Sequence, residues 1–184
     1  LFEWVCQAVE DIQEAVQARG EGVAGFWDAD CPKDEPSCQN VLWPRVKERL
    51  RSLGVSNIEE RYIGRNLCDL WVELPRPNAE PLAVAVELKI ARRGYGPARL
   101  VRPVETQLWG EYIRPSQARH GVYVVLWFRD ATRYDYPKSW SSPGELTEDL
   151  VSACAAVQQE HQIALKAYVM DLTTRPRGSP RSMS

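Results

Sequence analysis

Two strand-like segments separated by a short turn place the strongest constraint on how this chain can fold. The segment "CDLWVEL" covers residues 68–74 and "LAVAVELKI" covers residues 82–90, and both have the apolar, β-branched composition of strands. The connection between them, "PRPNAEP" at residues 75–81, is rich in residues that favour turns. The pattern therefore predicts a β-hairpin near the middle of the chain.

The register of this hairpin brings two acidic residues together. If the hairpin closes symmetrically, Leu74 lies opposite Leu82, and Asp69 then lies directly opposite Glu87. Side chains alternate along a strand with a period of two, so Lys89 shares the face of Glu87. Two facing carboxylates repel each other, which means that the pair needs a compensating cation. Lys89 is one such cation, and a divalent metal ion is another.

This group of side chains suits a particular chemistry. Hard cations such as Mg²⁺ bind one or two carboxylates, and a metal at Asp69 and Glu87 would acidify water and neutralise charge on a phosphate. The ammonium of Lys89 would orient the attacking water. A solvated Glu and Lys on an edge strand is the alternative interpretation of "ELK". Lysine is scarce among the 23 basic residues, which favours the catalytic interpretation: hydrolysis of phosphodiester bonds.

Apolar periodicity predicts the remaining elements of the domain. They are a helix over residues 1–19, a helix over 40–53, a strand over 59–63, a helix over 103–114, a strand over 120–128, a helix over 143–161 and a strand over 164–172. Residues 20–39 are expected to form a loop, with Asn40 or Ser37 capping the helix that follows and Pro44 in its first turn. This order predicts an α/β sandwich with a mixed central β-sheet flanked by helices.

Length and composition predict one main domain. The chain has 184 residues, of which 44% are hydrophobic, enough for a sizeable core. Residues 1–19 are expected to form an amphipathic helix that packs on this domain or connects to a missing upstream region. Residues 20–172 form the domain itself, and residues 173–184 a disordered tail. Because the chain begins at Leu1 rather than Met, further domains of a longer polypeptide are expected.

Cysteine usage and hydropathy predict a cytoplasmic protein. The five cysteines are scattered and lack the spacing of metal ligands, which indicates reduced thiols. No apolar run is long enough to cross a membrane, so no membrane partner is expected.

The hairpin and the segments that follow it resemble the PD-(D/E)XK, or restriction-endonuclease-like, superfamily. The residues Asp69, Glu87 and Lys89 resemble its Asp…Glu-x-Lys signature, although Cys68 stands where a proline often precedes the Asp. The segments "VETQLWGEYIR" and "HGVYVVLWF" resemble the Gln-bearing helix and the next strand of many bacterial members. The resemblance covers about residues 35–171 and implies a restriction-endonuclease-like sandwich. Related domains often lie at one end of large bacterial defence proteins.

The resemblance also implies roles for individual residues. Asp69 and Glu87 would bind Mg²⁺, or Mn²⁺ in its place, with the backbone carbonyl of Leu88 as a further ligand. Lys89 would assist the nucleophilic water, and Gln107 would point into the site. An upstream acid commonly contributes as well, and Glu60 and Glu35 remain alternatives for it.

Arginines cluster in the sequence around the predicted site, and such a cluster can bind a polyanion despite the formal net charge of −2. They are Arg61 and Arg65 before Asp69, and Arg92, Arg93, Arg99 and Arg102 after Lys89. A solvated or protein-binding surface is the alternative for this loop. Together these features predict a Mg²⁺-dependent nuclease with DNA as the expected substrate. The alternative is a noncatalytic nucleic-acid-binding or assembly module with the same fold, and a homodimer is left open.

Overall fold

A five-stranded mixed sheet forms the centre of the protein, in the strand order β3-β4-β5-β6-β7. The structure is a computed structural model that describes residues 1–28, 31–92, 94–128 and 139–173. The strands are β3 (Asn57–Ile63), β4 (Asn66–Arg76), β5 (Ala79–Ala91), β6 (His120–Trp127) and β7 (Ala164–Asp171). Strand β4 pairs antiparallel with both β3 and β5, whereas β5, β6 and β7 run parallel to one another. The predicted mixed sheet is thus confirmed.

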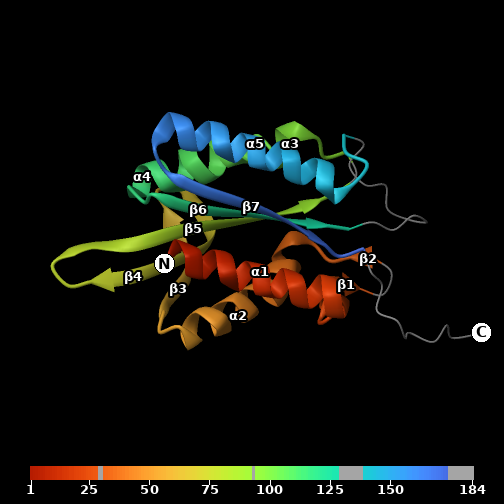
Figure 1. Cartoon of the computed structure of the whole chain (residues 1–184), viewed down its shortest axis with the longest axis horizontal. Coiled ribbons are helices and arrows are strands. Elements are labelled where there is room, and N and C mark those ends of the chain that lie inside the picture. Colours follow the sequence, from red (N-terminus) through yellow and green to blue (C-terminus); the bar gives the residue numbers. More distant parts are fainter. Residues whose placement is uncertain (29–30, 93, 129–138, 174–184) are drawn as a thin grey trace, which may run out of the picture.

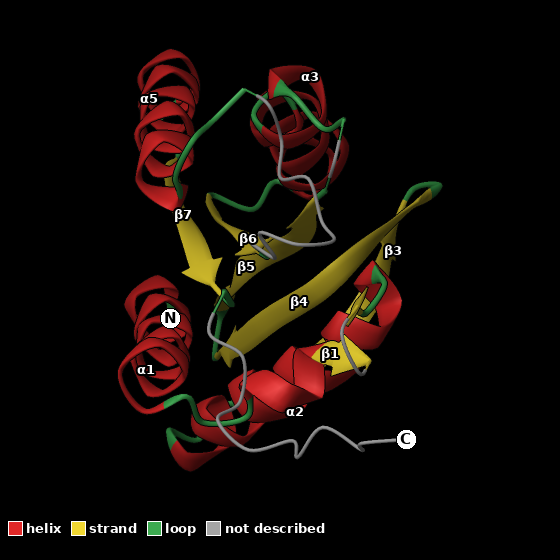
Figure 2. Ribbon diagram, turned by 90° about the vertical axis from the view of Figure 1, so that its right-hand side faces the viewer, coloured by secondary structure: helices red, strands yellow, loops and turns green. Residues whose placement is uncertain are grey.

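Helices cover both faces of the sheet (Figures 1 and 2). On one face lie α1 (Phe2–Arg19) and α2 (Glu35–Ser52). The other face carries α3 (Pro97–Leu100), the π-helix η2 (Val104–Ile113), α4 (Arg114–Ser116) and α5 (Pro143–His161). Each layer buries its own apolar cluster against the sheet. The architecture is therefore a three-layer α/β sandwich, as the order of the elements predicts.

Helix α1 belongs to the same folded unit as the sheet. Its apolar stripe of Val5, Val9, Ile12 and Val16 is buried in the core that α2 and the sheet also line. Of the two roles expected for residues 1–19, packing on this domain is the one that the structure describes.

The predicted register of the β4–β5 hairpin is confirmed. Leu74 pairs with Leu82, and Leu70 pairs with Val86 at the other end of the ladder. The turn is shorter than the seven residues expected, because β4 extends to Arg76 and β5 begins at Ala79. Asn78 occupies the turn with φ of 59°, a left-handed conformation that asparagine tolerates better than most residues.

The predicted loop over residues 20–39 is wrong over its last five residues, 35–39. Helix α2 already begins at Glu35, and its cap is Asp34, whose side chain accepts a hydrogen bond of 2.9 Å from the Ser37 N–H. Asn40 and Ser37 are therefore not the cap, and Pro44 lies inside the helix. An Asp cap followed by proline in the first turn is a regular helix start that the acidic, proline-rich composition concealed. The loop before it also contains the short elements η1 (Val23–Phe26), β1 (Trp27–Asp28) and β2 (Cys31–Pro32).

The tail, the membrane spans and the cysteines can be compared with the sequence predictions only over the described residues. The predicted tail lies outside the described residues except for Thr173. Within the described ranges, every helix is too short or too polar to cross a lipid bilayer. All five cysteines are free thiols, and only Cys31 is exposed.

Candidate active site

The candidate site forms where β4 separates from β5. The paired ladder between the two strands ends at Leu70 and Val86, one position before Asp69 and Glu87 would pair. Beyond this point side chains replace the backbone partners: the Leu88 N–H donates to Asp69 Oδ2 at 2.8 Å, and the Cys68 thiol donates to the Val86 carbonyl at 3.7 Å. The bond from Leu88 holds the Asp69 carboxylate against the edge of β5.

Glu87 is the one buried charged residue of the described chain, with 1% of its surface exposed. Its Oε1 accepts a hydrogen bond from Lys89 Nζ. Its Oε2 is buried and has no hydrogen-bond partner among the described residues. A buried carboxylate oxygen without a partner is costly, so this atom marks a place for a proton or a cation.

Asp69 and Glu87 influence each other's protonation. The two carboxyl groups lie close enough for the charge of Asp69 to act on Glu87. Burial, reinforced by the negative charge of Asp69, raises the pKa of Glu87 to about 8. Burial also raises the pKa of Asp69 to about 6, although the Leu88 N–H and Lys89 partly offset it. At neutral pH the pair therefore retains one proton, which a divalent cation would displace.

Lys89 lies between two carboxylates from different layers. Besides Glu87, its Nζ reaches Oε1 of Glu35 at 3.6 Å, in the first turn of α2. Burial lowers the pKa of Lys89, but Glu87 and Glu35 outweigh this effect, so the pKa is raised and the ammonium stays charged. The structure thus brings Glu35 to the site. Glu60 lies on β3, where the ladder with β4 shifts register, and its side chain is exposed.

Gln107 reaches the site only through a tyrosine. Its Nε2 donates to the Tyr112 hydroxyl at 2.7 Å, and that hydroxyl donates to the Leu67 carbonyl at 2.9 Å. Burial, then the charge of Glu87, raises the pKa of Tyr112 above its ordinary value. Gln107 therefore supports the start of β4, and in the described contacts it does not touch Asp69 or Glu87.

The sequence analysis missed a second tyrosine at the site. Tyr123 on β6 is the strand partner of Glu87, and it is fully buried. Its hydroxyl has no hydrogen-bond partner in the described part of the chain. Burial and the charge of Glu87 raise its pKa well above the ordinary value. A polar hydroxyl inside the apolar segment "GVYVVLWF" was the available signal.

The predicted arginines are spread around the site rather than gathered into it. Arg92 is close enough to Asp34, at the start of α2, to help Ser37 lower the pKa of that carboxyl. Arg65 is exposed at the β3–β4 turn, and Arg102 is exposed beside η2.

Two further arginines lie over aromatic rings. Exposed Arg99 lies 5.3 Å from the centre of the Tyr95 ring. Arg61 is bound to Glu73 at 2.8 Å and lies over Trp71. Arg93 falls outside the described residues.

The available donors suit a hard cation. Among the described residues no group of three or more His, Cys, Asp and Glu side chains could hold a metal ion. What the site offers is the carboxylates of Asp69 and Glu87 and the backbone of Leu88. Because the N–H and C=O of one residue point to the same edge of a strand, the Leu88 carbonyl points to the same edge as the N–H that binds Asp69. An all-oxygen set with few protein ligands fits Mg²⁺ or Mn²⁺.

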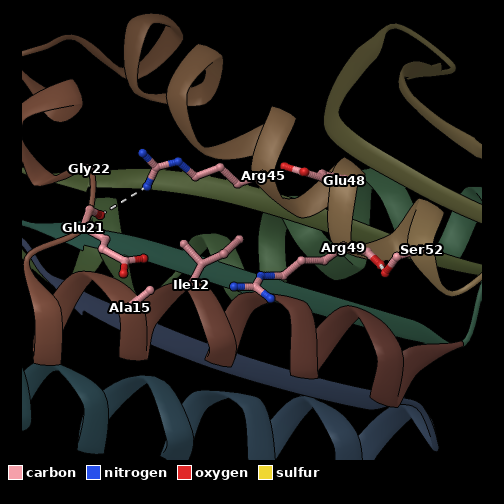
Figure 3. A pocket seen from close by; sticks show the side chains of 8 residues that line it. All are labelled: Ile12, Ala15, Glu21, Gly22, Arg45, Glu48, Arg49 and Ser52. Carbon is pink, nitrogen blue, oxygen red and sulfur yellow. Dashed lines mark hydrogen bonds between the residues drawn. The ribbon is translucent and has the colours of Figure 1, made fainter.

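A separate cleft of about 420 Å³ lies between α1 and α2 (Figure 3). Arg45 and Arg49 extend into it from α2. The Arg49 guanidinium pairs with Asp11 at 3.1 Å, and Arg45 donates to the Glu21 carbonyl at 3.4 Å. Glu21 and Glu48 also line the cleft, so its charge is mixed and does not define an anion site.

The fold and the site together define an α/β-sandwich protein with a partly buried Asp–Glu–Lys site at the open end of a hairpin. Residues 1–130 match a domain of unknown function, DUF8371, and the chain belongs to that family. The matched segment contains the carboxylate pair, Lys89, Glu35 and Gln107. No curated protein and no solved structure matches the chain.

Proposed function

We propose that this domain is a metal-dependent nuclease with a restriction-endonuclease-like fold of the PD-(D/E)XK superfamily, and that DNA is its substrate. The observation that carries the proposal is the buried Glu87 Oε2, which has no hydrogen-bond partner in the described part of the chain and belongs to a carboxylate close to Asp69 and Lys89. If Glu87 had only a structural role, the free-energy cost of burying this oxygen without a hydrogen bond would not be offset. A divalent cation at the same place would remove that cost and the repulsion between the carboxylates.

Each residue of the site has a role under this proposal. Asp69, Glu87 and the Leu88 carbonyl would hold Mg²⁺, which supplies charge neutralisation at the phosphate and makes water more acidic. The Lys89 ammonium donates a hydrogen bond to the attacking water and stabilises negative charge as it develops. Glu35 holds that ammonium in place from α2.

Other residues would position these groups or bind the substrate. Gln107 and Tyr112 fix the Leu67 carbonyl and, through it, the segment of β4 that carries Asp69. The exposed Arg65, Arg99 and Arg102 would contact phosphates, which requires no net positive charge on the whole chain.

A noncatalytic nucleic-acid-binding or assembly module is the second candidate. The observation that favours it is the lack of a third acidic ligand among the described residues, because Glu35 is turned to Lys89. Such a module would keep the fold and the arginines but would have no use for a bound metal.

One experiment separates the two candidates. The purified protein is incubated with single- and double-stranded DNA and RNA in Mg²⁺, Mn²⁺ or EDTA, and Mg²⁺ binding is measured by calorimetry. We expect cleavage only with metal. Glu87→Gln should lose both cleavage and metal binding, whereas Glu59→Gln, which neutralises an exposed acid on β3, should keep both. Metal-independent cleavage would contradict the proposal, and the absence of both cleavage and metal binding would favour the binding module.

A further inference from the structure

An exposed aromatic side chain lies on the hairpin that leads into the candidate site. Tyr62 is 70% exposed, and its direct cross-strand partner Leu67 is 40% exposed. The hairpin turns at Gly64, where φ is 63°, and Arg65 is exposed in the turn. An exposed aromatic ring next to an arginine is the combination with which proteins stack on a base and bind the neighbouring phosphate.

A cleft of about 450 Å³ opens beside this hairpin. It is lined by Arg61, Tyr62, Ile63, Trp71, Ala83 and Gln117, together with neighbouring residues. Trp71 follows Asp69 by two positions on β4, a rise of about 7 Å along the strand. One wall of the cleft thus lies on the strand that carries Asp69, and the volume of the cleft lies in the range of pockets that bind small ligands.

Two carboxylates line the cleft, exposed Glu80 and half-buried Glu73, and the second is bound by three neighbours. The Glu73 carboxylate accepts bonds from Asn57 at 3.1 Å, Arg61 at 2.8 Å and Trp71 at 3.2 Å. Its negative charge is thus compensated by neighbours. The Arg61 guanidinium lies 5.2 Å from the centre of the Trp71 ring and is held there by Glu73.

The opposite wall carries a polar group suited to the edge of a base. Gln117 is exposed and has φ of 59°, a left-handed conformation that few residues other than glycine adopt. Ser116 fixes this turn, because its hydroxyl accepts from the Ala118 N–H at 3.3 Å and donates to the Tyr112 carbonyl at 2.6 Å. An exposed amide at a fixed position can hydrogen-bond a base edge, as proteins that recognise unpaired bases do.

We propose that this cleft binds an unpaired base of the strand that is cut, so that the preferred substrate is single-stranded or locally unpaired nucleic acid. The proposal rests on the proposed nuclease function, since it assigns the substrate of that same site. In a duplex the base is stacked and paired, and its extrusion costs free energy that a single strand does not lose.

The test measures binding without cleavage. A fluorescently labelled single strand and a duplex of the same sequence are titrated with protein in EDTA and followed by anisotropy. Wild type should bind the single strand more tightly than the duplex. Tyr62→Ala should weaken single-strand binding by about 5- to 150-fold, the range for one lost stacking contact. Tyr62→Phe should bind within about 2-fold of wild type because it keeps the ring.

Two controls keep the result interpretable. Trp4→Ala removes another exposed aromatic ring, 40% exposed on α1, and should leave binding unchanged. Melting temperatures of all variants show whether each one is folded. Equal or tighter binding of the duplex, unchanged binding by folded Tyr62→Ala, or no binding to either nucleic acid would overturn the proposal. Because the assay contains EDTA, a failure of catalysis in Mg²⁺ leaves its result intact and is seen separately.

Discussion

The buried carboxyl group of Glu87 predicts a folding stability that decreases as the pH rises. In the unfolded chain its pKa is near 4.5, whereas in the folded protein burial and the charge of Asp69 raise the pKa to about 8. Between these values the folded state holds a proton that the unfolded state has released. The stability due to this proton is therefore fully present below the unfolded pKa and is lost as the pH rises through the folded pKa.

The magnitude follows from the two pKa values. Because the pKa rises from 4.5 to about 8 on folding, the free energy of unfolding falls by about 5 kcal/mol between pH values below 4.5 and pH values above 8. Solvent screens this effect little, because Glu87 is only 1% exposed. Asp69 acts in the same direction, since its pKa is raised from 3.8 to about 6.

Chemical denaturation from pH 5 to pH 9 in EDTA measures this effect. The free energy of unfolding of wild type should fall by several kcal/mol from pH 5 to pH 9. Glu87→Gln should lose much less, because an amide does not titrate there. Glu59→Gln, on the surface of β3, should follow wild type. Added Mg²⁺ should stabilise wild type more strongly as the pH rises, since metal and proton compete for the same oxygens.

Two results would refute this reasoning. One is an identical pH dependence in wild type and Glu87→Gln. The other is a wild-type stability that increases from pH 5 to pH 8, which would mean that Glu87 is charged throughout and is stabilised by Lys89 alone.

Three further predictions concern the residues around the pair. Lys89→Ala should keep or tighten Mg²⁺ binding in calorimetry, while single-turnover cleavage slows by about 10²–10⁴-fold. Lys89→Arg should not restore the rate. Full activity of either variant would exclude a catalytic role of Lys89. Tyr112→Phe should lower the free energy of unfolding by about 1 kcal/mol, because it removes the donor to the Leu67 carbonyl, and unchanged stability would show that this bond is not important. Replacing both Arg99 and Arg102 by Gln should weaken nucleic-acid binding for all sequences. It should also reduce the slope of log affinity against log salt concentration by about one per lost phosphate contact. An unchanged slope would mean that these arginines bind another partner.

The sequence predicts the hairpin well because its signals are local and agree with one another. A turn-rich segment lies between two strand-like segments, so a symmetric closure already gives the pairing of Leu74 with Leu82. The period of two then brings Asp69, Glu87 and Lys89 into one neighbourhood. Here local composition and tertiary structure require the same register.

The residues that the sequence left open or did not reveal depend on contacts between distant segments. Glu35 precedes Lys89 by more than fifty positions, and only the packing of α2 on the sheet chooses it over Glu60. Tyr112 reaches Leu67 from a π-helix, and the apolar periodicity that predicts a helix over residues 103–114 does not reveal its wider turn. Tyr123 matters because parallel pairing of β6 with β5 places it next to Glu87, and that pairing is set by the crossover between the strands.

The hydrogen bond from the Leu88 N–H to Asp69 has a consequence for how this family can change in evolution. Besides the metal binding that we propose, position 69 satisfies the backbone, so loss of the acceptor would leave a donor of β5 unsatisfied, at a cost of about 1–3 kcal/mol. Asparagine would retain an acceptor oxygen while removing the charge. The Glu87 carboxylate accepts its hydrogen bond from the Lys89 side chain and from no backbone N–H of the described residues. If the proposed function holds, a lineage released from catalytic selection should therefore lose the acid at position 87 more readily than the acceptor at position 69, so that aligned sequences of inactive members would keep Asp or Asn at position 69 for longer.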